Sequence, residues 1–246
     1  MSKLINKENQ NVPSVIWSIQ ENNEWKKLKS EDIFNNKTVV VFSLPGAFTP
    51  TCSSSHLPRY NELSSIFKEN GVDEILCISV NDTFVMNAWA ADQEANNITM
   101  IPDGNCTFTD EMGMLVDKRD IGFGKRSWRY SMLVKNGLIE KMFIEADVEG
   151  DPFEVSDADT MLDYINADAK KPVVATLLSK PNCPFCAKAK LALTKAGIGY
   201  EEITISNQNI TSKTLRAIAN AETVPQIFID GKHIGGSEAL ESYLKA

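Results

Sequence analysis

The sequence predicts an α/β protein built from two domains in tandem, each with a central mixed sheet flanked by helices. Apolar, β-branched runs of strand length alternate with helical patterns along the whole 246-residue chain. A short polar segment with a proline, residues 168–172, interrupts this alternation and is typical of a linker. On each side of it, a buried strand leads directly into a cysteine that opens a helix. The predicted domains are therefore residues 1–167 and 173–246.

The first domain shows a strand–helix–strand unit followed by a hairpin and a last helix. The run Thr-Val-Val-Val-Phe-Ser-Leu at 38–44 is apolar enough for a strand that is buried on both faces. Gly71 ends the next helix, Asn136-Gly137 is a hairpin turn, and Ser156 is expected to cap the last helix. The expected elements, in order, are an edge hairpin within 1–37, strand 38–44, helix 51–70, strand 74–80, helix 82–95, a strand end at 100–104, helix 108–115, a hairpin of 130–134 with 139–144, and helix 156–167.

The second domain repeats this order at a smaller size. Its expected elements are strand 173–178, a helix from Cys183 to about Gly197, strand 200–205, helix 212–219, hairpin 224–233 and helix 237–244. Asp230-Gly231 provides the hairpin turn. A strand–helix–strand unit followed by a hairpin and a helix is the order of the thioredoxin-like fold. We therefore expect two thioredoxin-like domains.

The octapeptide Pro-Gly-Ala-Phe-Thr-Pro-Thr-Cys at 45–52 joins the first buried strand to its helix. Cys52 is therefore expected at a helix N-terminus, where free N–H groups and the helix dipole favour a thiolate over a thiol. Thr49 can place its hydroxyl against that sulfur or against an oxygen bound beside it, and Pro45 stiffens the loop. The alternative is an inert, buried cysteine in an ordinary loop.

The pattern Pro-x-x-x-Thr-x-x-Cys, formed by Pro45, Thr49 and Cys52, resembles the active site of the peroxiredoxins. The full octapeptide resembles their Prx5-like branch. Arg129, in Trp-Arg-Tyr-Ser-Met-Leu-Val at 128–134, matches the arginine that completes the site in this family. The resemblance covers about residues 10–167. It implies that Cys52 reduces hydrogen peroxide and alkyl hydroperoxides in a homo-oligomer, either a dimer or a tetramer.

The first domain departs from this family in one respect. Many Prx5-like enzymes use a second, resolving cysteine late in the domain, but no cysteine lies between Cys106 and Cys183 here. Ser156 occupies that general region instead. The thiol that recycles Cys52 is therefore expected from outside the domain.

Cys183 and Cys186 follow a strand and open a helix. In this setting a Cys-x-x-Cys pair indicates thiol–disulfide chemistry rather than a metal site, because zinc would need two further ligands. The sequence Cys-Pro-Phe-Cys resembles the dithiol glutaredoxins, over all of residues 171–246, with Cys183 as the expected attacker. The resemblance implies that glutathione contacts Lys180, Thr223, Val224, Pro225, Gly236, Ser237 and Glu238.

Together, the two halves resemble the bacterial hybrid proteins in which a Prx5-like peroxiredoxin is fused to a glutaredoxin. This implies a glutathione-dependent thiol peroxidase. Cys52 becomes a sulfenic acid, glutathione condenses with it, and Cys183 takes over the glutathione. Either a further glutathione or Cys186 then clears Cys183, and the sequence leaves both routes open. Glutathione is thus expected as a reducing co-substrate, with no permanently bound cofactor and no metal.

Two other functions stay open at this point. The chain could be a thiol–disulfide oxidoreductase that removes glutathione from other proteins, with the first domain as a peroxide sensor. It could also bind an iron–sulfur cluster through Cys183 in a glutathione-bridged dimer. The cluster is the weaker alternative, because cluster-binding glutaredoxins usually lack the second cysteine, here Cys186.

Composition limits the partners and the location. The formal net charge is −8 and no basic block stands out, which argues against nucleic acid. No apolar run is long enough to span a bilayer, and residues 1–10 are too polar for a secretory signal. Five cysteines, an odd number, suit a reducing compartment. We therefore expect no membrane partner and a cytoplasmic protein.

Some reactive residue types are expected to be structural. Cys77 lies in the middle of an apolar strand and is expected in the core. Cys106 lies in a loop, is expected to be exposed, and its redox role is open. His56 lies one helical turn after Cys52 and could tune it, but is expected to pack or hydrogen-bond structurally. Trp89 and Trp128 are expected to pack rather than to bind a ligand.

Overall fold

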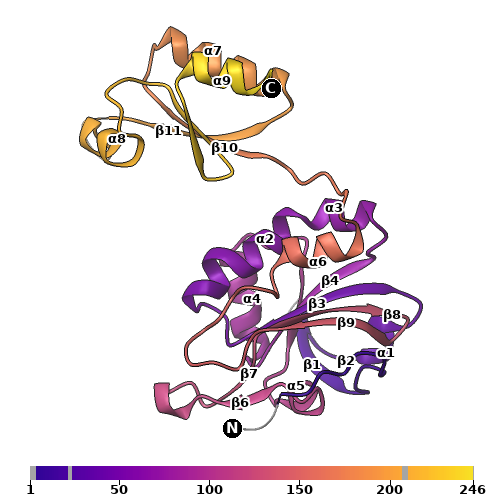
Figure 1. The fold of residues 1–246 in the computed structure, drawn as a ribbon. Helices are drawn as coiled ribbons and strands as arrows, with labels where there is room; N and C mark the ends of the chain where they lie inside the picture. Colours follow the sequence, from indigo (N-terminus) through magenta and orange to yellow (C-terminus); the bar gives the residue numbers. More distant parts are fainter. Residues whose placement is uncertain (1–3, 22–23, 207–209, 246) are drawn as a thin grey trace. The chain divides into compact units, whose positions relative to one another are not determined.

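The computed structural model describes residues 4–21, 24–206 and 210–245. The chain divides into two compact units, residues 1–170 and 171–246, and this division falls inside the predicted linker. Each unit is built around its own mixed sheet with helices packed on it (Figure 1). None of the helices in the described ranges is long and apolar enough to cross a membrane.

The first unit has a five-stranded sheet in the order β5-β4-β3-β8-β9. Its strands are β3 (Thr38–Leu44), β4 (Glu74–Ser79), β5 (Thr99–Pro102), β8 (Tyr130–Lys135) and β9 (Leu138–Ile144). The central strand β3 pairs in parallel with β4 on one side and antiparallel with β8 on the other. Asn136 and Gly137 turn the β8–β9 hairpin with positive φ angles of 47° and 78°, as an Asn-Gly turn requires.

Both faces of β3 are buried, which explains its continuous apolar sequence. Val40 and Phe42 point into one core, which is covered by α2 (Leu57–Glu62), α3 (Ser64–Glu69), α4 (Thr83–Asp92) and α6 (Ala158–Ile165). Val39 and Val41 point into the other core, where side chains of β1 (Ile16–Glu21), α1 (Ser30–Phe34) and α5 (Thr107–Glu111) pack.

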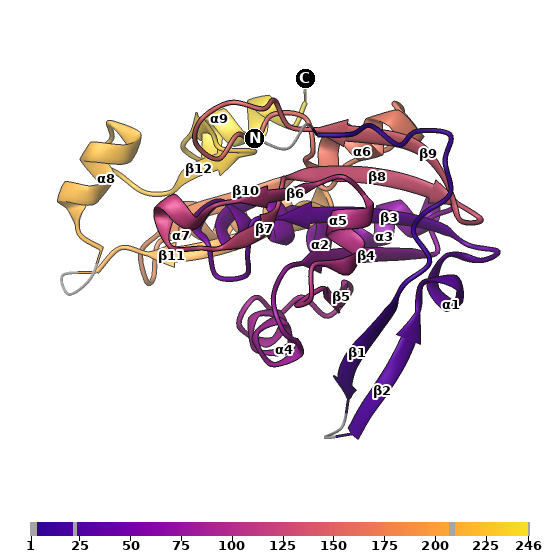
Figure 2. The same ribbon diagram turned by 90° about the horizontal axis from the view of Figure 1, so that it is seen from below.

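The predicted edge hairpin forms from β1 and β2 (Glu24–Lys29), but it is a separate two-stranded sheet that extends away from the main sheet (Figure 2). A second small sheet pairs β6 (Leu115–Asp117) with β7 (Lys125–Ser127), with a 3-10 turn, η2 (Arg119–Ile121), between them. The sequence pattern predicted neither this sheet nor α1, because all of these elements are short.

The prediction of one continuous helix over 51–70 is wrong. The segment is α-helical at residues 50–51 and then widens into a π-helical turn, η1 (Cys52–His56), in which the N–H of Leu57 donates to the carbonyl of Cys52. Pro58 has no N–H to continue the normal ladder, which favours this wider turn. The helix then breaks at Leu63, whose ψ of 2° is not helical although its side chain stays in the core.

Two further predictions need correction. Helix α5 ends at Glu111 rather than Leu115, because Gly113 takes a left-handed φ of 70° and Leu115 enters β6. Ser156 does not cap α6. Asp157 does, with its carboxylate accepting from the N–H of Thr160 at 2.9 Å, whereas the hydroxyl of Ser156 points to another partner described below.

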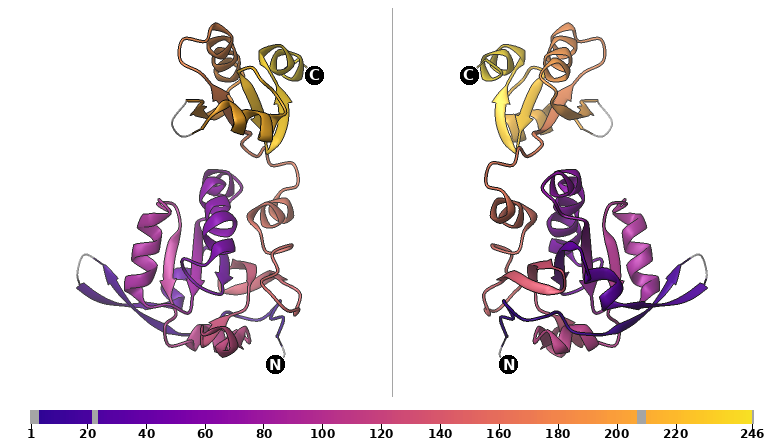
Figure 3. Two further views of the ribbon diagram at one scale, coloured as in Figure 1. Left: turned by 90° about the vertical axis from the view of Figure 1, so that its left-hand side faces the viewer. Right: turned by 90° about the vertical axis from the view of Figure 1, so that its right-hand side faces the viewer.

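The second unit repeats the arrangement with four strands in the order β11-β10-β12-β13. They are β10 (Val174–Ser179), β11 (Gly199–Thr204), β12 (Gln226–Ile229) and β13 (Lys232–Gly235). The helices α7 (Pro184–Lys195) and α9 (Ser237–Tyr243) lie side by side on one face (Figure 3), and α8 (Ser212–Ala219) packs in a separate cluster. In both units the central strand leads into the loop that carries the cysteine.

Candidate active sites

Cys52 lies in the first turn of the helical segment after β3. The carbonyl of Thr49 accepts the first helical bond, from the N–H of Ser53 at 3.0 Å, so Cys52 falls among the N–H groups that a helix start leaves free. The side chain of Cys52 is fully buried. The hydroxyl of Thr49 donates to the carbonyl of Gly46 at 2.9 Å, which fixes its orientation and leaves its lone pairs available.

The structure brings Pro45, Thr49 and Arg129 to one pocket of about 290 Å³. The remaining lining residues are Pro50, Thr51, Lys118, Ile121, Phe123, Trp128, Gly150, Asp151 and Pro152. Three predicted residues from two distant segments therefore meet at this pocket, and Cys52 is buried beside Arg129, close enough for their side chains to interact.

Arg129 is a buried cation, only 1% exposed, with its guanidinium held from several sides. Its Nη2 donates to both oxygens of Asp151 at 2.5 and 2.6 Å, and its Nη1 lies 3.0 Å from Nδ1 of His56. Burial by itself would lower the pKa of Arg129, but the hydrogen bond to Asp151 and the charge of Cys52 raise it. The Nε of Arg129 is buried without a partner in the described part of the chain. The guanidinium can thus stabilise a thiolate and still donate to a bound oxygen.

His56 belongs to this site, although a structural role was the one expected for it from the sequence. It is fully buried, and burial next to Arg129 lowers its pKa to about 3, so the ring is neutral. Its Nε2 lies 3.1 Å from the carbonyl oxygen of Ser156, which can only accept, and Arg129 can only donate. The ring therefore carries its proton on Nε2 and presents the Nδ1 lone pair to Arg129. Its spacing of four residues from Cys52 placed it on the right helix face.

Glu145 holds the segment that accepts from His56, and no sequence motif pointed to it. Its carboxylate is 2% exposed and accepts from the N–H groups of Glu154, Val155 and Ser156 and from the Ser156 hydroxyl at 2.7 Å. Burial would raise the pKa of Glu145, but these hydrogen bonds hold it below its usual value. A charged Glu145 thus fixes the carbonyl of Ser156 in front of His56.

The second candidate site is the start of α7, where Cys183 is the N-cap residue. Its sulfur accepts from the N–H of Cys186 at 3.2 Å and lies 3.9 Å from the carbonyl oxygen of Val224. Cys183 is half-buried, whereas Cys186 is 2% exposed. Burial and the hydrogen bond with Cys183 raise the pKa of Cys186 to about 11. Cys183 is therefore the more accessible thiol of the pair.

The residues predicted to contact glutathione lie in three loops near Cys183. The Val224–Pro225 bond is cis, and a Cβ on Gly236 would lie 3.7 Å from the Pro225 carbonyl oxygen, so those two loops adjoin. Lys180 is exposed and lines a cavity with both cysteines. The other three positions are exposed or at a helix start: Thr223 and Glu238 are exposed, and Ser237 is the buried first residue of α9.

The other two cysteines line neither cavity, although Cys77 lies in the same hydrophobic core as Cys52. Cys77 is fully buried in β4, as predicted, and burial raises its pKa well above the usual value. Cys106 is half-buried rather than exposed, and burial also raises its pKa. Within the described residues, no three His, Cys, Asp or Glu side chains form a group that could hold a metal.

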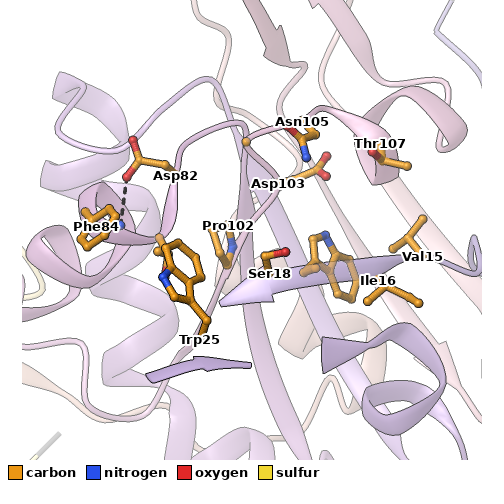
Figure 4. Close-up of a pocket in the computed structure, with 13 residues that line it drawn as sticks. Val15, Ile16, Ser18, Trp25, Asp82, Phe84, Pro102, Asp103, Asn105 and Thr107 are labelled. Carbon is orange, nitrogen blue, oxygen red and sulfur yellow. Dashed lines mark hydrogen bonds between the residues drawn. The ribbon is translucent and has the colours of Figure 1, made fainter. Parts of the chain in front are cut away.

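A further cavity, of about 220 Å³, lies between the β1–β2 hairpin and α4 (Figure 4). Trp25 and Phe84 meet there edge to face, with ring centroids 5.9 Å apart. Asp82 caps α4 at its rim by accepting from the N–H of Phe84 at 2.9 Å. None of the predicted site residues lines this cavity.

Both halves of the chain are similar to known protein families. The Redoxin family model matches residues 7–162 and the Glutaredoxin model matches residues 175–234. The chain is 58% identical to the hybrid peroxiredoxin hyPrx5 of Haemophilus influenzae over 96% of this chain and 98% of that protein. It is 53% identical to a peroxiredoxin of Synechocystis over 63% of this chain and 88% of that one.

Solved structures resemble the first unit. Reduced Prx3 of Vibrio vulnificus, in complex with hydrogen peroxide, shares 39% identity with a TM-score of 0.62 and covers 65% of this chain and 99% of that one. The 1-Cys peroxiredoxin of Plasmodium falciparum, described as an antioxidant protein, shares 38% identity with a TM-score of 0.62, covering 66% of this chain and 100% of that one.

Proposed function

We propose, from the premise that this chain belongs to the peroxiredoxins as a hybrid of a peroxiredoxin with a glutaredoxin domain, that it is a peroxidase driven by glutathione. Residues 1–167 would form the peroxidase domain, and residues 173–246 the domain that recycles it. The observation that carries this proposal is the buried guanidinium of Arg129, which contacts Cys52, His56 and Asp151 at a pocket open to a small ligand.

In the first step the Cys52 thiolate attacks one oxygen of the peroxide. The O–O bond breaks, Cys52 becomes a sulfenic acid, and the other oxygen leaves as water or an alcohol after taking up a proton. Arg129 has an unpartnered Nε among the described residues and is suited to donate to the charged oxygen in the transition state. Thr49 and Pro45 shape the pocket around the peroxide.

Glutathione then condenses with the sulfenic acid, releasing water and leaving a mixed disulfide on Cys52. Cys183 attacks the glutathione sulfur of this disulfide, so that Cys52 leaves as a thiolate and Cys183 carries the glutathione. In one route a second glutathione attacks the glutathione sulfur of this new disulfide, which releases oxidised glutathione and returns Cys183 as a thiolate. In the other route Cys186 attacks the Cys183 sulfur and releases glutathione, and two glutathiones then reduce the Cys183–Cys186 disulfide to complete the cycle. The lack of any cysteine between Cys106 and Cys183 supports this route, since the first domain offers no late resolving thiol of its own.

The pocket beside Cys52 supports both hydrogen peroxide and alkyl hydroperoxides as substrates. The similar Prx3 of Vibrio vulnificus has been solved in complex with hydrogen peroxide. Most of the side chains around the pocket here are apolar, including Ile121, Phe123 and Trp128, so an alkyl group finds a matching surface.

A steady-state assay tests the proposal. Peroxide, glutathione, glutathione reductase and NADPH are mixed with the full-length protein, without thioredoxin, and NADPH consumption is followed. We expect turnover that saturates with glutathione and disappears in Cys52→Ser. Removal of glutathione from a glutathionylated test protein, without peroxide turnover, would instead support the deglutathionylating function.

We also infer that the protein is a homo-oligomer, either a dimer or a tetramer. Large apolar side chains are exposed around the pocket, with Phe48, Ile121 and Val148 each more than half exposed. An apolar rim of this kind is typical of a surface covered by another subunit. Light scattering after size exclusion checks this, and a monomer at micromolar concentration would contradict it.

A further inference from the structure

A cavity of about 370 Å³ opens beside the cysteine pair of the second unit, and besides Lys180 and the two cysteines it is lined by residues that have no role in the cycle described so far. It is lined by both cysteines and by Ser179 at the end of β10, Lys190 on α7 and Glu202 on β11. We call the last three residues the Lys190 cluster. They lie on the β11 side of β10, whereas the predicted glutathione loop at Val224 leads into β12 on the other side.

The Lys190 cluster is held by specific contacts. Lys190 follows Cys186 by four residues on α7, so both side chains lie on the same helix face. Its Nζ lies 3.1 Å from both carboxylate oxygens of Glu202, and the Ser179 hydroxyl donates to Glu202 at 2.6 Å. Both partners of this ion pair keep about a third of their side-chain exposure, so the pair fixes the position of Lys190 more than it stabilises the fold.

Cys186 needs help to react, because it is buried. Burial and the hydrogen bond with Cys183 raise the pKa of Cys186 to about 11, whereas the backbone N–H of Lys180 and the charge of Lys190 act in the opposite direction. Lys190 in turn keeps its proton, because the hydrogen bond to Glu202 raises its pKa. The titratable groups that act on Cys186 are thus Cys183 and Lys190, and Glu202 and Tyr200 act in turn on Lys190.

We propose that Lys190, held by Glu202 and Ser179, is a positioning residue that activates Cys186 for attack on the Cys183–glutathione disulfide. In that step the Cys186 thiolate bonds to the Cys183 sulfur, the Cys183–glutathione S–S bond breaks, and glutathione leaves as a thiolate. The proton of Cys186 passes to water at the cavity. This inference rests on the proposed glutathione cycle, and it assigns to Lys190 the activation of the step in which Cys186 attacks.

The test uses full-length protein carrying Cys52→Ser, so that oxidised glutathione alone drives the reaction and peroxide chemistry is not needed. Oxidised glutathione is added to the reduced protein, samples are acid-quenched over milliseconds to seconds, and intact masses are recorded. Formation of the glutathione adduct reports the first step, and its loss to the internal disulfide reports attack by Cys186. We expect Lys190→Gln to slow the second step about two- to fivefold near neutral pH and move its pH midpoint upward, as loss of a partly screened charge does.

Matched variants separate activation from structural damage. Lys190→Arg should restore most of the rate of the second step. Lys188→Gln, on the same helix but paired with Glu241 at 2.8 Å, should leave both steps unchanged. An unchanged second step and pH midpoint in Lys190→Gln would overturn the inference, and so would an equal loss in both steps. If the Cys52→Ser protein shows normal adduct chemistry but the wild type shows no peroxide turnover with glutathione, the proposed function is refuted and the role of Lys190 is not.

Discussion

Nδ1 of His56 lies 3.0 Å from the guanidinium of Arg129, and the two residues meet across 73 positions of sequence. The imidazole of His56 must be neutral beside Arg129, because a protonated ring would place two buried positive charges in contact. His56 therefore orients Arg129 without adding charge, and Asp151 supplies the counter-charge on the other side. The site is thus built to keep one cation fixed next to Cys52.

Replacing Arg129 by alanine should slow peroxide reduction by about 10²-fold or more, because a buried charge that stabilises the transition state is lost. Stopped-flow measurement of the second-order reaction of reduced protein with peroxide gives the rate. Arg119→Ala is the matched control, since Arg119 is 80% exposed and pairs with Asp117. Equal rates in Arg129→Ala and wild type would assign the role to another cation, such as Arg126.

His56 should make the first unit sensitive to acid. Its pKa falls from 6.5 to about 3 on folding, so between those pH values the unfolded chain binds a proton that the folded site excludes. The titration of His56 therefore does not change the free energy of unfolding above pH 6.5, and it lowers that free energy progressively as the pH falls from 6.5 toward 3. His56→Phe should be less stable than wild type at pH 7.5, and the gap should narrow at pH 5, because the variant lacks this proton uptake.

Tryptophan fluorescence in urea can measure that gap, because all four tryptophans, Trp17, Trp25, Trp89 and Trp128, lie in the first unit. If wild type and His56→Phe differ by the same free energy of unfolding at both pH values, His56 titrates normally in the folded protein. That result would contradict the effect expected from its burial.

Glu145→Gln should destabilise the first unit by about 2 kcal/mol, because the amide replaces a charged acceptor of backbone N–H groups and presents donors to other donors. The same urea titration measures the change. Glu154→Gln is the control, because the exposed Glu154 contributes its backbone N–H to this cluster. A loss shared by both variants would mean that surface charge, rather than the buried acceptor, matters here.

The sequence predicted the elements whose signals are local. Strand β3 and helix α8 have the predicted bounds, 38–44 and 212–219, and the Asn136–Gly137 and Asp230–Gly231 turns lie where expected. Each of these depends on a few adjacent residues, such as a continuous apolar run or a pair that accepts positive φ. The positions of Cys52 and Cys183 at the start of helices were predictable for the same reason, because each follows an apolar run and precedes a helical pattern.

The parts that escaped prediction depend on distant segments. Glu145 and Asp151 look like ordinary acidic residues in a polar loop, and their roles appear only when folding brings Ser156 and Arg129 to them. Asp157 caps α6, whereas the hydroxyl of Ser156 donates to Glu145 instead. Periodicity and short motifs do not reveal these contacts, since Glu145 and Ser156 lie 11 positions apart and Arg129 and Asp151 lie 22 positions apart.

The two cysteines of the second unit should separate in function. Cys183→Ser should abolish glutathione-supported turnover while leaving one stoichiometric burst of peroxide consumption at Cys52, because oxidation of Cys52 does not need the second unit. Cys186→Ser should keep a substantial part of the turnover, because glutathione itself can attack the adduct on the accessible Cys183. Burst amplitude and steady-state rate are measured for both variants in the same coupled assay.

The burial of the pair is the physical reason for this difference. Cys186 is 2% exposed and its pKa is raised to about 11, so it reacts only when Cys183 already carries a disulfide within its reach. If Cys186→Ser is as inactive as Cys183→Ser, the internal disulfide is obligatory and glutathione cannot replace it. If Cys183→Ser turns over normally, the second unit is not the reductant of Cys52, and the recycling thiol must be glutathione acting alone.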